Sequence, residues 1–341
     1  MMKKFASRFS KVIVLAILAT ALMGCTPNDT KEVGNQAQED TQIKEDISIV
    51  ALKGPTGMGL VDIMEKSEND EGALNYNISL ADSPDDIVGK IISKEVDIAA
   101  VPSNLALTLY NRTEGQVQIV AVNTLGVLYI VENGDTVNTM EDLRGKNLHV
   151  SGIGATPDFV LRYLLQENNL DIDRDLEVDF TLQNADLATA LAQGDVDLAL
   201  LPQPHVTTAM MRNEDLRIAL DITKEYREAS GTDSNLPMGA IIVQREFAEN
   251  NKEALEKFLE EYKESVNFVN SNQDEAAELI AKFEILPNPQ VAKNAIPYSN
   301  IVFIDAMDIR SDLEEYYNIL FNFEPKSIGG KLPKDDFYYQ R

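Results

Sequence analysis

The chain has 341 residues, of which 56 are acidic and 30 are basic, so its formal net charge is −26 at pH 7. Binding to nucleic acid requires clustered lysine and arginine side chains, and the sequence contains no such cluster. The composition therefore argues against a nucleic-acid-binding protein and fits a well-solvated, exposed one.

The N-terminus has the pattern of a secretory signal peptide. Four basic residues precede an apolar stretch over residues 12–23, which ends in small residues. This stretch is far shorter than the roughly 20 residues that a membrane-spanning helix needs. We therefore predict a signal peptide over residues 1–24 that is removed on secretion.

Cys25 follows directly and is the single cysteine of the chain, so it cannot form an internal disulfide. Together with Leu22, Met23 and Gly24 it resembles the bacterial lipobox, in which a diacylglycerol is attached to the cysteine at the cleavage site. We expect a lipid anchor at Cys25 that holds the protein at the outer face of the cell membrane. Residues 25–46 are polar and lack aromatic side chains, which predicts a flexible tether.

Residues 47–341 are enough for one large or two medium domains. Short β-rich runs alternate with amphipathic helical patterns over the first two-thirds, and the last third is mostly helical. This alternation predicts an α/β fold in which mainly parallel sheets are covered by helices. The expected strands are 47–52, 76–80, 96–101, 117–122, 127–131, 148–151, 178–182, 196–201, 218–221 and 240–243, and the expected late helices are 252–270, 274–283 and 306–321.

One segment recurs at a spacing of 100 residues. Residues 95–102 read EVDIAAVP and residues 195–202 read DVDLALLP. Each copy is an apolar run that follows a helical pattern and ends at a proline, as a buried parallel strand does. The repetition predicts two similar α/β lobes.

Several further segments, in their order and spacing, resemble the NMT1/THI5-like family of nitrate-, sulfonate-, taurine- and thiamine-pyrimidine-type binding proteins. The segments are 140–146 (MEDLRGK), 152–156, 188–197 (ATALAQGDVD), Leu236-Pro237 before the strand 240–243, and the helix pair around Phe258 and Ala276-Ala277.

The resemblance implies a type II periplasmic-binding-protein-like fold with two lobes. One lobe comprises residues 47–123 and 237–341, the other comprises residues 124–236, and the chain crosses between them twice. Ligand is expected in the cleft between the lobes, at the carboxyl ends of the parallel strands. Closure about the two crossings would then bury it.

The implied function is that of a monomeric, extracytoplasmic receptor lipoprotein that delivers a small organic molecule to an ABC permease and its ATPase. Three alternatives stay open: an accessory protein of a membrane sensor, a receptor for sulfonate or nitrate, and a thiamine-pyrimidine biosynthetic enzyme of the same fold.

Polar residues in the strand-end turns are the candidates for ligand contact. The glycine-rich turn after the first strand opens a helix, whose N-terminal dipole favours negative charge. Serine, asparagine and threonine in such turns can equally be helix N-caps. The candidates are Lys53, Thr56, Gly57, Met58, Ser103, Asn104, Thr124, Thr156, Asp158, Gln203 and Asn235.

Catalysis and metal binding have little support in the sequence. His149 and His205 are the two histidines, 56 residues apart, and no Ser-His-Asp or Cys-His arrangement can be assembled from them. They form no recognisable metal-ligand cluster either, although a metal receptor built from carboxylates stays open. We therefore expect a non-enzymatic protein without cofactor or metal.

Ligand chemistry is the point on which the family and the residues disagree. Sulfonate and taurine binders of this family typically carry a serine at the start of a second-lobe helix, and the matching residue here is Ala155. Asp158 follows, and an ionised carboxylate 4 Å from a sulfonate would oppose it by about 4 kcal/mol at an effective dielectric constant near 20. Alternatively, Asp158 only stabilises the helix N-terminus. These residues favour a neutral or cationic ligand, such as a pyrimidine-like heterocycle.

Overall fold

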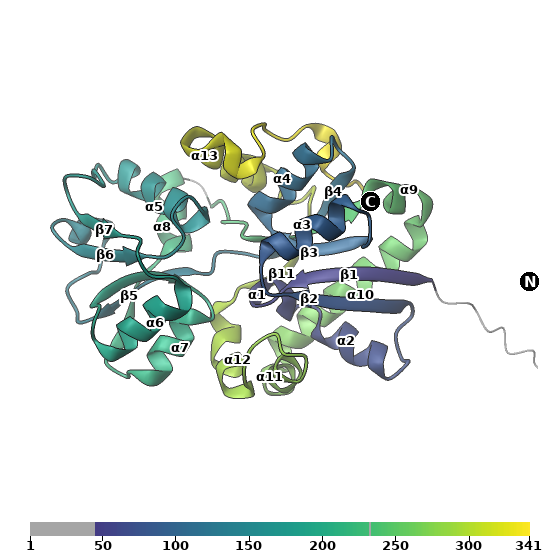
Figure 1. Cartoon of the computed structure of the whole chain (residues 1–341), viewed down its shortest axis with the longest axis horizontal. Helices are drawn as coiled ribbons and strands as arrows, with labels where there is room; N and C mark the ends of the chain where they lie inside the picture. Colours follow the sequence, from purple (N-terminus) through teal and green to yellow (C-terminus); the bar gives the residue numbers. More distant parts are fainter. Residues whose placement is uncertain (1–44, 232) are drawn as a thin grey trace, which may run out of the picture. The chain divides into compact units, whose positions relative to one another are not determined.

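Two β-sheets of buried aliphatic residues, one in each lobe, form the framework of the protein (Figure 1). The structure is a computed structural model that describes residues 45–231 and 233–341. The predicted signal peptide, Cys25 and the tether up to residue 44 therefore lie outside the described residues. Both lobes belong to a single compact unit, residues 44–341.

Lobe 1 has a six-stranded sheet in the order β11, β4, β10, β3, β1, β2. Its strands are β1 (Asp46–Leu52), β2 (Asn75–Ala81), β3 (Ile98–Pro102), β4 (Val117–Thr124), β10 (Gly239–Gln244) and β11 (Ile301–Asp305). Its helices are α1 (Pro55–Met58), α2 (Val61–Glu68), α3 (Pro84–Ile92), α4 (Ser103–Arg112), α9 (Arg245–Asn250), α10 (Lys252–Ser271), α11 (Gln273–Lys282), α12 (Pro289–Ala295) and α13 (Arg310–Phe323), with short 3₁₀ turns η2 (Ile296–Tyr298), η3 (Pro325–Ile328) and η4 (Asp335–Phe337).

Lobe 2 has a five-stranded sheet in the order β7, β6, β8, β5, β9. Its strands are β5 (Leu128–Asn133), β6 (Asn147–Val150), β7 (Glu177–Asp179), β8 (Leu198–Pro202) and β9 (Leu216–Asp221). Its helices are α5 (Thr156–Glu167), α6 (Asn184–Gln193), α7 (His205–Arg212) and α8 (Ile222–Ser230), with the 3₁₀ turn η1 (Met140–Leu143).

The two sheets share one topology. In lobe 1, β2, β1, β3, β10 and β4 are neighbours in that order, and in lobe 2, β7, β6, β8, β5 and β9 take the same places. The recurring segment forms β3 and β8, which are equivalent strands with the same burial pattern. The predicted two-lobed α/β fold is confirmed, while the exact residue boundaries of the lobes stay a prediction.

Both sheets are mixed, because β10 and β11 in lobe 1 and β5 in lobe 2 run against the other strands of their sheets. Strands β1 to β4 share one direction, and so do β6 to β9. β10 and β5 are antiparallel to both of their neighbours, and each is the first strand that the chain forms after it crosses between the lobes. A strand that enters a lobe at the edge where the parallel strands end must run away from that edge, so it is antiparallel.

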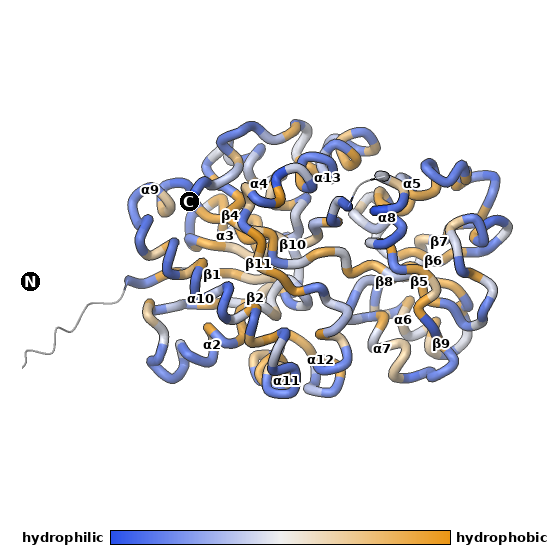
Figure 2. Tube along the Cα trace, turned by 180° about the vertical axis from the view of Figure 1, so that it is seen from behind, coloured by the Kyte–Doolittle hydropathy of each residue, from blue (hydrophilic) through white to orange (hydrophobic). Residues whose placement is uncertain are grey.

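Figure 2 shows the hydrophobic residues concentrated along the strands of both lobes. The late helices α10 and α11 lie close to their predicted positions. The predicted helix 306–321 begins later, at Arg310, because residues 306–309 form a turn after β11. β11 was not among the predicted strands.

Close packing at the two crossings depends on glycine. A Cβ atom on Gly126, in the first crossing, would lie 1.8 Å from Thr223 Oγ1 of α8. A Cβ atom on Gly239, just after the second crossing, would lie 2.5 Å from Asn123 Oδ1. The crossings also pair directly, because the Met238 amide donates to the Thr124 carbonyl at 2.9 Å.

We predict that Gly126→Ala lowers the free energy of unfolding by about 1–3 kcal/mol, the usual cost of overpacking a tight site. Urea denaturation followed by circular dichroism measures this change. Gly89→Ala is the matched control, because a Cβ atom at that helical position meets nothing within 4 Å. The control should be neutral or stabilising by up to about 1 kcal/mol, and equal stability of the Gly126→Ala protein and wild type would contradict the close packing.

Candidate functional site

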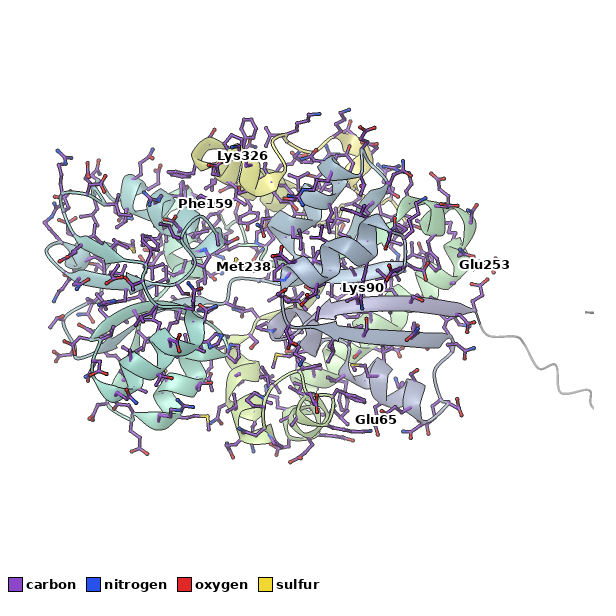
Figure 3. The ribbon with its side chains drawn as sticks, in the orientation of Figure 1. Glu65, Lys90, Phe159, Met238, Glu253 and Lys326 are labelled. Carbon is purple, nitrogen blue, oxygen red and sulfur yellow. The ribbon has the colours of Figure 1, made fainter. Side chains whose placement is uncertain are left out.

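A pocket of about 480 Å³ lies between the lobes, where strands of both sheets end. Met238, on the second crossing, is labelled in Figure 3 between the two lobes and forms part of the pocket wall. The lining residues are Leu52, Lys53, Gly54, Pro55, Thr56, Asp82, Pro84, Pro102, Asn104, Thr124, Val127, Ala155, Thr156, Pro157, Asn184, Pro202, Gln203, Pro204, His205 and Met238.

Helix N-termini surround this pocket. Asn104, Thr156, Asn184 and His205 all lie within the first two positions of α4, α5, α6 and α7, and all four line the pocket. Each helix begins there because its preceding strand ends at the cleft. The amide groups and dipole of a helix N-terminus favour negative charge, so the backbone makes this pocket electropositive.

Lys53 is the one lysine or arginine among the lining residues of the described chain. It follows β1 and pairs with Asp82, which follows β2, at 2.9 Å between Nζ and Oδ1. The hydrogen bond to Asp82 raises the pKa of Lys53, so the ammonium is charged at neutral pH. Asp82 is largely exposed to solvent, with 82% of its side chain accessible, so this pair is weakly held and a ligand anion can compete for Lys53.

Gln203 is buried in the pocket wall, with 3% of its surface exposed. Its Oε1 atom accepts a hydrogen bond from Thr207 Oγ1 at 2.8 Å and a longer one from the Thr207 amide at 3.4 Å. Its Nε2 atom has no hydrogen-bond partner within the described chain. The pocket wall therefore contains an unused donor.

His205 is the first residue of α7, and within residues 45–231 and 233–341 no charged neighbour offsets its burial. Desolvation lowers the pKa of its imidazole below the usual 6.5, so the ring is neutral at pH 7. Asn184 is held differently, since its side-chain oxygen accepts a hydrogen bond from Ser151. Both residues line the pocket from lobe 2.

Six of the eleven predicted contact residues line the pocket: Lys53, Thr56, Asn104, Thr124, Thr156 and Gln203. Their contact with a ligand stays a prediction. Three lining residues were not predicted as ligand contacts: Asp82, Asn184 and His205. Each follows a strand end or opens a helix, so the strand-end rule that found the others also applies to them.

Gly57, Met58 and Ser103 do not line the pocket, because each is buried in lobe 1. Gly57 lies so close to the chain that a Cβ atom would be 2.7 Å from the Leu52 carbonyl oxygen. Met58 is fully buried in the hydrophobic core. Ser103 is also fully buried, and its carbonyl accepts a hydrogen bond from the Tyr317 hydroxyl at 3.0 Å.

Asp158 and Asn235 do not line the pocket either. Asp158 is buried in the first turn of α5, where it accepts hydrogen bonds from the Gly154 amide at 2.9 Å and from Arg162 Nε at 2.6 Å. It therefore stabilises the start of α5 and lies outside the pocket in which a sulfonate would bind. Asn235 is bonded to Asp312 and Arg227 on the second crossing.

Two further findings concern the described residues as a whole. Residues 45–231 and 233–341 contain no group of three or more His, Cys, Asp or Glu side chains arranged to hold a metal ion. In the same part of the chain, no helix has both the length and the apolar character needed to cross a membrane.

Similar structures have the same fold. An ABC transporter protein from Parabacteroides distasonis matches with a TM-score of 0.73 and 22% identity, over 87% of this chain and all of that one. The periplasmic aliphatic sulphonate binding protein SsuA from Escherichia coli matches with a TM-score of 0.69 and 17% identity, over 87% of this chain and 92% of that one. A zinc-bound ligand-binding component of an ABC-type import system from Staphylococcus aureus matches with a TM-score of 0.66 and 13% identity, over 87% of this chain and 97% of that one.

Sequence comparison identifies the family. A binding protein of Brucella abortus is 25% identical over 175 residues, and the chain spans about half the length of the curated relatives it matches. The family model that matches is not the NMT1/THI5-like one, so that subgroup is not confirmed. The matching model describes the ABC transporter, phosphonate, periplasmic substrate-binding protein, and it covers residues 62–286. Since this is well over half of its length, the chain belongs to this family of periplasmic substrate-binding proteins of ABC transporters.

Proposed function

We propose that this protein is a lipid-anchored, extracytoplasmic receptor that binds a small organic molecule with a phosphonate- or sulfonate-type oxyanion and delivers it to an ABC permease. The convergence of four helix N-termini on a pocket with one lysine and one unused amide donor carries this proposal. Oxyanions are acceptors of hydrogen bonds, so a pocket rich in donors suits them.

The proposal departs from the neutral or cationic ligand expected from Asp158. That carboxylate does not line the pocket and is already paired with Arg162. The carboxylate that does line the pocket, Asp82, is paired with Lys53 and exposed to water. No uncompensated negative charge among the lining residues of the described chain therefore opposes an anion.

The pocket also has room and apolar wall for an organic substituent. Its volume of about 480 Å³ lies within the range of roughly 300–1,000 Å³ that is usual for small-molecule sites. Leu52, Val127, Met238 and several prolines supply apolar surface beside the donors. The phosphonate description of the family and the sulphonate-binding function named for the E. coli neighbour support a ligand of this kind.

Calorimetry at pH 7.5 tests the charge of the ligand with four butyl compounds: butylphosphonate, butanesulfonate, butanesulfonamide and butyltrimethylammonium. We expect the two anions to bind at least about 100-fold more tightly than the neutral sulfonamide, because each carries a negative charge and accepts several charge-assisted hydrogen bonds. Saturating anion should also reduce the radius of gyration by closing the lobes.

Asp158→Asn is the control for this experiment and should leave the affinities unchanged, since Asp158 lies outside the pocket wall. Tighter binding of the sulfonamide or of the cation than of either anion would refute the oxyanion proposal.

Protonation of His205 should make the affinity for an anionic ligand depend on pH. The charge of butanesulfonate does not change between pH 8 and pH 5.5, and Lys53 stays charged over this range because its pKa is raised above 10.5. A bound anion stabilises the protonated imidazolium form of His205, so a proton is taken up when the anion binds. The affinity for butanesulfonate should therefore rise as the pH falls. The linkage limits this rise to about tenfold per pH unit.

His205→Asn should remove this slope, since the variant keeps a polar side chain that does not titrate. Calorimetry at four pH values measures both slopes. An affinity for butanesulfonate that falls on acidification in wild type would count against an anion near His205.

Membrane anchoring is proposed to occur through Cys25. One acyl chain gives only marginal membrane binding, so the two or three chains of a bacterial lipoprotein are needed for retention. We expect Cys25→Ala to move the protein from the membrane fraction to the soluble fraction of the cells that express it. Retention of the Cys25→Ala protein in the membrane fraction, at the level of wild type, would contradict the assignment.

A further inference from the structure

The two ends of the Gln203 side-chain amide are in different situations. Oε1 accepts from both the hydroxyl and the amide of Thr207, in the first turn of α7. Nε2 is buried without a partner in the described chain, and Gln203 is one of the residues that line the pocket. Because Oε1 is hydrogen-bonded and Nε2 is not, the two ends of this amide group can be told apart.

The identity of each end follows from chemistry. A backbone N–H can only donate a hydrogen bond, so the atom opposite the Thr207 amide must be an acceptor. Exchange of Oε1 and Nε2 would place an NH₂ group against that N–H, which is repulsive. The end of the Gln203 side chain that lacks a partner is therefore the donor end.

The position of Gln203 is fixed as well as its direction. Pro202 and Pro204 flank it, and a proline restricts both its own φ angle and the conformation of the preceding residue. The backbone N–H of Gln203 donates to the Val127 carbonyl at 2.9 Å. With its backbone and its Oε1 atom both held, the side chain cannot turn to satisfy Nε2 elsewhere.

A buried donor without a partner is costly to the folded protein. We propose that Gln203 Nε2 is a specificity-determining donor to an unprotonated oxygen of the ligand, and that Thr207 positions it. This inference rests on the proposed oxyanion function. A ligand that presents an N–H or O–H at this point places two donors against each other and is rejected, since neither hydrogen bond can form.

Gln203→Glu tests the donor directly, because glutamate has the same shape and keeps an oxygen for Thr207. We expect the affinity of the purified mature protein for butanesulfonate to fall by about 100-fold or more, since a hydrogen bond to a charged ligand is lost and a like charge faces it. Gln290→Glu is the matched control: it makes the same change at an exposed position of α12 and should bind as wild type does.

Thr207 tests the positioning role. Thr207→Val removes the hydroxyl that holds Oε1 but keeps the side-chain shape, and we expect about tenfold weaker binding of butanesulfonate. The ratio of the affinities for butanesulfonate and butanesulfonamide should fall with it, because a freed amide can turn its oxygen to the sulfonamide N–H. Thr207→Ser restores the hydroxyl and should recover most of both quantities, which a purely structural role of the threonine methyl group would not produce.

The outcomes separate this inference from the function on which it rests. If wild type binds butanesulfonate and Gln203→Glu binds it equally well, the donor role of Gln203 is wrong and the oxyanion function stands. If Thr207→Val and Thr207→Ser do not differ, the positioning role is wrong. If wild type binds neither butylphosphonate nor butanesulfonate, the oxyanion function and the inference fall together.

Discussion

The common direction of β1 to β4 and of β6 to β9 is the constraint on which the pocket depends. Each of these strands ends at the cleft, and the chain there turns into a helix or a crossing. The helices that follow must begin at the cleft, so their free amide groups and dipoles accumulate on one pocket from both lobes. The electropositive character of the site is therefore a property of the topology, and the side chains only modify it.

Proline is the main modifier. Six of the residues that line the pocket are prolines, in turns where strands end and helices begin: Pro55, Pro84, Pro102, Pro157, Pro202 and Pro204. Each proline fixes its φ angle, and Pro55, Pro84 and Pro157 each remove one N–H donor from the start of a helix. The pocket thus presents fewer backbone donors than its helices could supply, but presents them in a rigid arrangement. Rigid walls lower the entropic cost of binding. Because some backbone donors are missing, side-chain donors such as Lys53 and Gln203 must supply a larger share of the hydrogen bonds to the ligand.

The position of the pocket could be predicted from the sequence more reliably than the residues that line it. The repeated segment and its terminal proline correctly placed β3 and β8, and the turn after each strand includes lining residues. Strand-end position alone does not say which way a side chain points. Ser103 and Gln203 both adjoin the terminal proline of a repeat, yet Ser103 packs under α13 and Gln203 lies in the pocket wall. Asp158 lies outside the pocket lining, and the sequence does not show that Arg162, one helical turn later, donates to its carboxylate.

Helix α13 gives the two lobes a connection that the crossings do not provide. The Tyr316 hydroxyl lies 3.1 Å from the hydroxyl of Thr156, a pocket residue of lobe 2, and the next residue, Tyr317, donates to the Ser103 carbonyl of lobe 1. Both tyrosines are fully buried, and burial raises the pKa of each well above its ordinary value, so both hydroxyls keep their protons at physiological pH. Any rotation of lobe 2 about the crossings must therefore carry α13 with it or break one of these two bonds. The start of α5, which forms part of the pocket wall, is in this way mechanically coupled to the C-terminal helix.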